Sequence, residues 1–280
     1  MKNAVWFIRA LILIILAACV GLYTQRIQIQ DVLSELSAPE LPEEVGYREV
    51  VEVIKVSEGV EVLPTELACG ELCESVADPE VVEEVEVPSA EFNLAVPFTS
   101  QAPHANWDEV HEETCEEASL YMVHEFYQGT MGVIAPDTAE AELQKIIAQE
   151  MAQFGFYKDT TADETAELIK ALYGYTRVDV LTDPSADDLK TLIATGHPII
   201  VPAAGRQLGN PNFSGLGPIY HMFVLRGYTE TQFITNDPGT RRGEEYVYDI
   251  DVIMNAMHDW NGGDVESGAK KVIVVYPNST

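Results

Sequence analysis

The segment that most constrains the fold is the helix predicted to begin at Cys115. From residue 118 to residue 127 the apolar side chains recur at helical spacing over most of the circumference, and Gly129 follows as a stop signal. The polar residues of the helix gather on one stripe, formed by Glu117, His124 and Gln128. A helix this apolar must be covered by other elements. We therefore expect it to lie at the centre of a domain.

Cys115 occupies the amino-terminal tip of this helix. Unpaired backbone N–H groups and the positive end of the helix dipole favour an anion at that position. A thiol there tends to ionise, and the thiolate is the nucleophilic form of cysteine. The structural alternative is a small buried residue, the commonest environment of an isolated cysteine. Position alone leaves both interpretations open.

The net charge and the placement of the cysteines exclude several classes of function. The chain of 280 residues has a formal net charge of −30, which argues against nucleic-acid binding and against broad adhesion to anionic lipid. Its four cysteines lie in three unlike settings: Cys19 in an apolar run, Cys69 and Cys73 in an acidic stretch, and Cys115 at the helix tip. We therefore expect no common metal site, no disulfide scaffold and no cofactor.

Residues 1–27 have the pattern of an export signal. A run that is apolar except for Arg9 follows the basic Lys2. Leu16-Ala17-Ala18-Cys19 resembles the lipobox of bacterial lipoprotein signals, whereas residues 20–23 stay apolar, which favours an uncleaved membrane anchor. Both alternatives place the remaining chain outside the cytoplasmic membrane.

Residues 28–91 are predicted to be an acidic, disordered tether. The stretch is rich in Val, Glu and Pro, is almost free of Lys and Arg, and contains few aromatic residues. Cys69 and Cys73 within it are close enough to form a disulfide in an oxidising location. A zinc site is the weaker interpretation, because two further ligands would be needed.

Residues 92–280 are predicted to form an α+β domain, because helical patterns precede a series of strands. After a short strand over residues 93–100 and the helix at Cys115, helices are predicted over 138–154, 161–173, 185–195 and 252–260, and strands over 177–182, 198–203, 221–228, 232–236, 244–248 and 270–276. The loop 205–218, rich in Gly and Pro, is long enough to border a cleft.

A cysteine nucleophile needs a base and a group that orients that base. His221 opens an apolar strand, and Asn236 and Asp237 end the next one. Because strand side chains alternate, only one of Asn236 and Asp237 can face His221. Each residue also has an ordinary structural explanation: His221 as a hydrogen-bonded sheet histidine, Asp237 as a turn initiator.

Gln101 follows the first strand and offers an amide donor. An acyl-transfer site needs such a donor for the developing oxyanion, beside the amide of the nucleophile itself. The order of Gln101, Cys115, His221 and Asp237 along the chain is more informative than any one of these residues alone.

The chain resembles the papain-like cysteine peptidases of the bacteriocin-leader-processing type, in particular their stand-alone relatives, the peptidase C39-like domains. The motifs that match are Val96-Pro97-Phe98-Thr99-Ser100-Gln101-Ala102-Pro103, Asn106-Trp107, Cys115-Glu116-Glu117-Ala118-Ser119, His221-Met222-Phe223-Val224-Leu225-Arg226-Gly227-Tyr228 and Asn236-Asp237-Pro238. The resemblance implies a papain-like fold, a peptide or protein substrate, and four roles. These are Gln101 as oxyanion-hole donor, Cys115 as nucleophile, His221 as general base and Asp237 as orienting acid.

Two features depart from the family pattern. The loop from Gln101 to Cys115 is longer than in the transporter-fused peptidases, and Glu116-Glu117 stand where those enzymes have small residues. Two carboxylates beside the thiol would oppose thiolate formation. The chain also lacks a Gly-rich loop ending in Gly-Lys-Ser/Thr, so we do not expect this domain to be part of a transporter chain.

Two other function classes remain open from the sequence. A cell-wall amidase of the NlpC/P60 kind also places Cys at a helix start and His on a strand, but generally uses a second histidine where this chain has Asp237. A binding module that kept the fold and lost the activity is the other alternative.

Overall fold

The computed structural model describes residues 39–58 and 89–278. The expected export signal over residues 1–27 and the cysteines Cys19, Cys69 and Cys73 lie outside the described residues. Within the described ranges, no helix combines the length and apolar character needed to cross a membrane.

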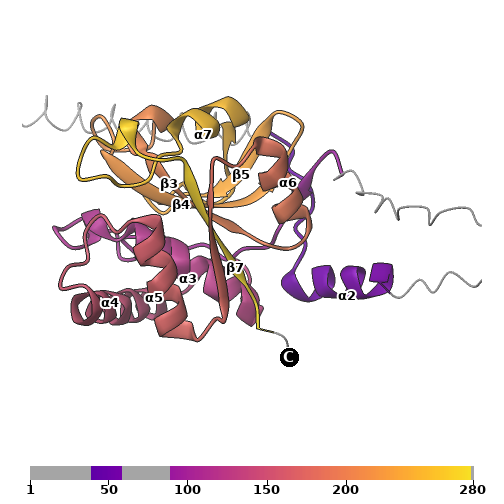
Figure 1. The fold of residues 1–280 in the computed structure, drawn as a ribbon, viewed down its shortest axis with the longest axis horizontal. Helices are drawn as coiled ribbons and strands as arrows, with labels where there is room; N and C mark the ends of the chain where they lie inside the picture. The colour runs from indigo at the N-terminus through magenta and orange to yellow at the C-terminus, as the bar shows by residue number, and fades with distance from the viewer. Residues whose placement is uncertain (1–38, 59–88, 279–280) are drawn as a thin grey trace, which may run out of the picture. The chain divides into compact units, whose positions relative to one another are not determined.

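The fold is α+β, as predicted (Figure 1). The α-helices are α2 (Tyr47–Glu58), α3 (Cys115–Gln128), α4 (Pro136–Gln153), α5 (Ala162–Tyr173), α6 (Ala186–Ala194) and α7 (Ile250–Ala256). The strands are β1 (Phe92–Asn93), β2 (Arg177–Thr182), β3 (Ile199–Ala204), β4 (Tyr220–Tyr228), β5 (Gln232–Asn236), β6 (Tyr246–Asp249) and β7 (Lys271–Tyr276). They form one antiparallel sheet in the order β2-β7-β3-β4-β5-β6, with β1 also paired to β4.

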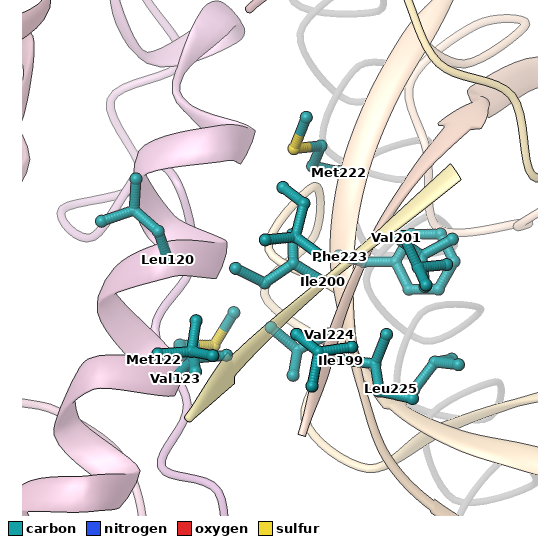
Figure 2. Close-up of a cluster of buried hydrophobic side chains, with 14 of the residues drawn as sticks. Leu120, Met122, Val123, Ile199, Ile200, Val201, Met222, Phe223, Val224 and Leu225 are labelled. Carbon is teal, nitrogen blue, oxygen red and sulfur yellow. The ribbon is translucent and has the colours of Figure 1, made fainter. Parts of the chain in front are cut away.

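Helix α3 packs directly on this sheet, mainly against β4 and β3. Figure 2 shows Leu120, Met122 and Val123 of α3 beside the strands, with Val201 and Phe223 on the far side of the sheet from the helix. All five side chains are buried. Burying apolar residues on both faces of β3 and β4 places these strands at the centre of the domain and fixes the start of α3 relative to them.

The helix signals read from the sequence are confirmed. Helix α3 ends at Gly129, whose φ of 83° is left-handed and favours glycine. Helix α5 begins with the capping box of Thr161 and Glu164. The predicted strands 177–182 and 232–236 coincide with β2 and β5.

The strand expected over residues 93–100 is much shorter in the structure. Only Phe92 and Asn93 pair with β4 as a strand, and isolated bridges at Leu94 and Phe98 follow. Pro97 has no N–H to donate to a ladder. The pairing with β4 also requires Gly227, where a Cβ would lie 2.5 Å from the backbone oxygen of Phe92.

Residues 42–58 differ from the expected tether over residues 28–91. They belong to the same compact unit as residues 89–278. Val45 bridges to Leu94, Val50 is 4% exposed, and the ring of Tyr47 lies 5.1 Å from that of Tyr127. A few apolar residues at suitable spacing therefore outweigh the acidic composition of this segment.

Other elements cover two residues of the polar stripe on α3. Glu117 is completely buried. His124 stacks on the ring of Tyr173 at 3.6 Å and bonds to Tyr175. Helices α4 and α5 pack against α3 on one side and the sheet packs against it on another, which is the central position expected for so apolar a helix.

Candidate active site

Cys115 stands at the first residue of α3 and is 6% exposed. The preceding Thr114 donates from Oγ1 to the backbone oxygen of Gln101 at 2.9 Å, which ties the helix start to the end of the first extended segment. The sulfur of Cys115 accepts a hydrogen bond from the backbone N–H of Met222, the residue after His221. This contact brings the tip of α3 to the part of β4 that contains His221.

His221 is paired with Asp237. Its Nε2 lies 2.7 Å from Oδ1 of Asp237, and both side chains are buried. An ionised carboxylate only accepts hydrogen bonds, so Nε2 carries the proton. Neutral His221 then has its lone pair on Nδ1, the nitrogen that can accept a proton from a nucleophile.

Three further groups donate to Asp237. Tyr248 donates its hydroxyl to Oδ2 at 2.6 Å, Asn210 donates its side-chain amide to Oδ2 at 3.1 Å, and the backbone N–H of Gly239 donates to Oδ1 at 3.0 Å. Burial by itself would raise the pKa of Asp237, but His221, Tyr248 and Gly239 together keep that pKa below its ordinary value. The site therefore holds Asp237 as a carboxylate.

Asn236 faces the other way, which confirms that only one of the two neighbours meets His221. Its side-chain amide donates to the backbone oxygens of Val96 at 2.9 Å and Pro97 at 3.2 Å, and its oxygen accepts from Arg226. Asn236 thus holds the segment leading to Gln101 against the sheet.

The ring of His221 is fixed by close packing. Phe213 lies edge-on to it, with ring centroids 5.3 Å apart. A Cβ on Gly239 would lie 2.8 Å from Cε1 of His221, and a Cβ on Gly205 would lie 3.1 Å from its Cβ. These two glycines leave room for the imidazole, whereas larger residues would displace it.

Gln101 lies between the two halves of the site. Its backbone N–H donates to the oxygen of Pro238 at 3.0 Å, and its Nε2 donates to the backbone oxygen of His111 at 2.8 Å. A carbonyl can only accept, so this bond fixes which way the amide points. The second N–H of Nε2 remains for another acceptor, while Oε1 is buried without a hydrogen-bond partner.

His111 is itself anchored. Its Nδ1 lies 2.7 Å from Asp108 and its Nε2 lies 2.9 Å from Glu140. These contacts fix the long loop between Gln101 and Cys115, and through the carbonyl of His111 they fix the Gln101 amide.

The thiol of Cys115 is protonated in this arrangement. It donates to Oε2 of Glu116 at 3.1 Å and has no direct hydrogen bond to His221. Burial, followed by the charge of Glu116, raises the pKa of Cys115 well above its ordinary value. Burial also raises the pKa of Glu116, to about 8. The structure thus brings together all four predicted residues, with the thiol held by Glu116.

Several residues of the site were not predicted from the sequence. Asn210 lies in the loop 205–218 that was expected to border a cleft, and Tyr248 lies in the last part of a predicted strand, but neither position signals contact with Asp237. The bond from Cys115 to Glu116 was likewise not foreseen. Among the described residues, no group of three or more His, Cys, Asp and Glu side chains is arranged as a metal site.

A cysteine at the start of a helix packed on an antiparallel sheet, with a His–Asp pair on that sheet, is the arrangement of the papain-like cysteine peptidases. A family model of the Peptidase_C39 like family matches residues 93–262, which is more than half of the chain. The protein belongs to this C39-like peptidase family, as the resemblance of its motifs indicated.

The chain is also similar in structure to a Bacillus anthracis protein whose crystal structure is described as that of a "putative C39-like peptidase". The identity is 16%, the TM-score is 0.45, and the match covers 68% of this chain and 99% of that one. No curated protein matches the chain.

Proposed function

We propose that the protein is a cysteine peptidase that uses Cys115 as nucleophile, His221 as general base and Asp237 as the group that orients the base. The observation that carries this proposal is the buried His221–Asp237 pair, with Nε2 engaged at 2.7 Å. That bond leaves Nδ1 as the proton acceptor on the same strand whose Met222 N–H contacts the Cys115 sulfur.

In the proposed reaction, Nδ1 of His221 takes the thiol proton and the Cys115 sulfur bonds to the carbonyl carbon of a peptide. The oxyanion is stabilised by the backbone N–H of Cys115 and the second N–H of Gln101 Nε2. Collapse breaks the C–N bond, and His221 returns the proton to the leaving amine. Water then hydrolyses the thioester, with His221 again acting as base, and Cys115 is regenerated.

We further propose that the domain acts outside the cytoplasmic membrane of a bacterium, held there by residues 1–27. The support is the sequence alone: Lys2 followed by an apolar run. The protein should then fractionate with membranes, and external protease should reach the domain; recovery in the cytosol would contradict the proposal. A mobility change in Cys19→Ser would identify a lipoprotein, and no change an uncleaved anchor.

An inactive binding module is the second candidate, because the thiol donates to Glu116 at 3.1 Å instead of to His221. A peptidyl electrophile separates the two. An active enzyme should label at Cys115 faster than free cysteine reacts near neutral pH, and Cys115→Ala should lose both this label and peptide hydrolysis. Labelling at the rate of free cysteine would favour the binding module. An NlpC/P60-like amidase would instead hydrolyse cell-wall fragments and not protein substrates.

A further inference from the structure

The start of α3 contains a cluster of buried carboxyl groups that the proposed reaction does not use. Glu116 and Glu117 are 1% and 0% exposed, and Glu150 of α4 is 0% exposed. The carboxyl groups of Glu117 and Glu150 interact with each other, and no other group donates a hydrogen bond to their oxygens. Burying carboxylates in this way is costly, so such groups retain protons that exposed carboxylates lose.

Glu116 is the member of the cluster that contacts the nucleophile. Its Oε2 lies 3.1 Å from the sulfur of Cys115, and both side chains are shielded from water. At this distance one proton can lie on either atom, as S–H···⁻O₂C or as S⁻···HO₂C. The first form holds Cys115 as a thiol, and the second donates a hydrogen bond to the thiolate.

The ionisable side chains that face Glu116 from the surrounding elements are acidic or phenolic. Glu113 precedes α3, and Asp159 lies in the loop before α5, both acting to raise the pKa of Glu116. Tyr220 of β4 lies close enough to interact with Glu116 and with Cys115. The ammonium of Lys158 lies 3.7 Å from Glu113. The charges of Glu113 and Asp159 thus oppose the ionisation of Glu116, and Glu116 in turn raises the pKa of Glu117 and Glu150.

We propose that Glu116 is a positioning residue that controls the ionisation of the Cys115 thiol. When Glu116 is neutral, it donates to the thiolate and permits the transfer of the thiol proton to His221. When Glu116 is ionised, it accepts the S–H and its charge opposes the thiolate. This inference rests on the proposed function, in which Cys115 is the nucleophile.

The sign of the pH effect follows from the order of ionisation. Burial raises the pKa of Glu116 to about 8, so Glu116 is neutral below that pH and the thiolate is tolerated. Above it, the new carboxylate makes the thiolate harder to form. Cys115 and Glu116 should therefore titrate in two coupled steps, and thiolate formation should be spread over a wide pH range.

The test is the rate of alkylation of Cys115 by iodoacetamide from pH 6 to 10, followed by mass spectrometry of the peptide containing Cys115 in the full chain. The variants are Glu116→Gln, which keeps a donor and removes the charge, and Glu112→Gln, an exposed control with the same change of charge. We expect Glu116→Gln to react as the wild type does at pH 6 and about tenfold faster at pH 9, the effect of one pKa unit. Glu112→Gln should follow the wild type throughout.

A ratio of Glu116→Gln to wild type that is the same at every pH would overturn the proposal. If Glu116→Gln does not fold, the wild-type curve decides: two steps support coupling to Glu116, and a single ionisation step contradicts it. Peptide hydrolysis separates this inference from the proposed function. Two-step alkylation without any hydrolysis would retain the control by Glu116 and reject the peptidase.

Discussion

The site has two halves, the His221–Asp237 pair on the sheet and the start of α3, and buried carboxyl groups differ in ionisation between them. On the sheet, Asp237 is buried and ionised because His221, Tyr248 and Gly239 stabilise its charge. At the start of α3, Glu116 and Glu150 are equally shielded, and burial raises the pKa of each to about 8. Burial is common to both halves, so the partners decide which carboxyl keeps its charge.

This difference assigns separate tasks to the two halves. The His221–Asp237 half is pre-organised as a proton acceptor, with its ring fixed by Phe213 and Gly239. The half at α3 holds Cys115, the proposed nucleophile, as a thiol through its bond to Glu116. A substrate or a change of pH that moves the thiol proton from Cys115 to His221 would connect them.

The largest effect is expected from removing the base. His221→Ala should lower kcat for peptide hydrolysis by about 10²- to 10⁴-fold, the usual contribution of a positioned general base. His124→Ala, which changes a histidine on the side of α3 that faces α5, should leave kcat unchanged. Equal losses of kcat in the two variants would show that His221 is not the general base.

Asp237 and Asn236, which are adjacent at the end of β5, are expected to respond differently to substitution. Asp237→Ala should lower kcat, though by less than His221→Ala, because Asp237 orients the base and does not exchange the substrate proton. Asn236→Ala should mainly lower the free energy of unfolding, by about 1–3 kcal/mol, since it leaves the buried carbonyls of Val96 and Pro97 without a donor. Urea unfolding and steady-state kinetics measured on both variants would separate the effects, and the reverse pattern would indicate a Cys-His-Asn site.

The smallest effect is expected from substituting Glu150, the buried glutamate of α4 that does not contact Cys115. The pKa of Glu150 is about 8 in the folded chain and near its ordinary value of 4.5 when unfolded, so the folded state binds more protons between these values. Stability should therefore fall as pH rises from 4.5 to 8. Glu150→Gln should raise the Tm at pH 8 more than at pH 5, whereas the exposed Glu112→Gln should not. A Tm difference independent of pH would show that Glu150 ionises normally.

The sequence predicts the order of elements well because that information is local. The periodicity after Cys115, the capping box at Thr161 and the turn residues between strands each act within a few residues. Strand alternation also predicted that His221 meets only one of Asn236 and Asp237. The turn between β4 and β5 falls at residues 229–231, as the two predicted strands require, and the Thr229 N–H donates to the oxygen of Gln232 across it.

Contacts between distant segments could not be predicted in the same way. Tyr248 and Asn210 reach Asp237 only after the sheet and the loop have folded, and nothing in their local patterns indicates it. The complete burial of Glu117 could not be predicted either, because periodicity describes one helix and not the elements that cover it. Residues 42–58 resembled a tether because composition does not show where Tyr47 and Val50 pack.

The most direct test of the proposed catalytic arrangement is the structure of the protein with a bound peptide aldehyde. We expect a bond from Cys115 Sγ to the aldehyde carbon, and the former aldehyde oxygen within hydrogen-bond distance of the Cys115 N–H and of Gln101 Nε2. We also expect Nδ1 of His221 to face the adduct while its Nε2 remains hydrogen-bonded to Asp237. An aldehyde bonded to another residue would contradict the proposed role of Cys115. An adduct at Cys115 that contacts neither Gln101 nor His221 would contradict the proposed roles of those two residues.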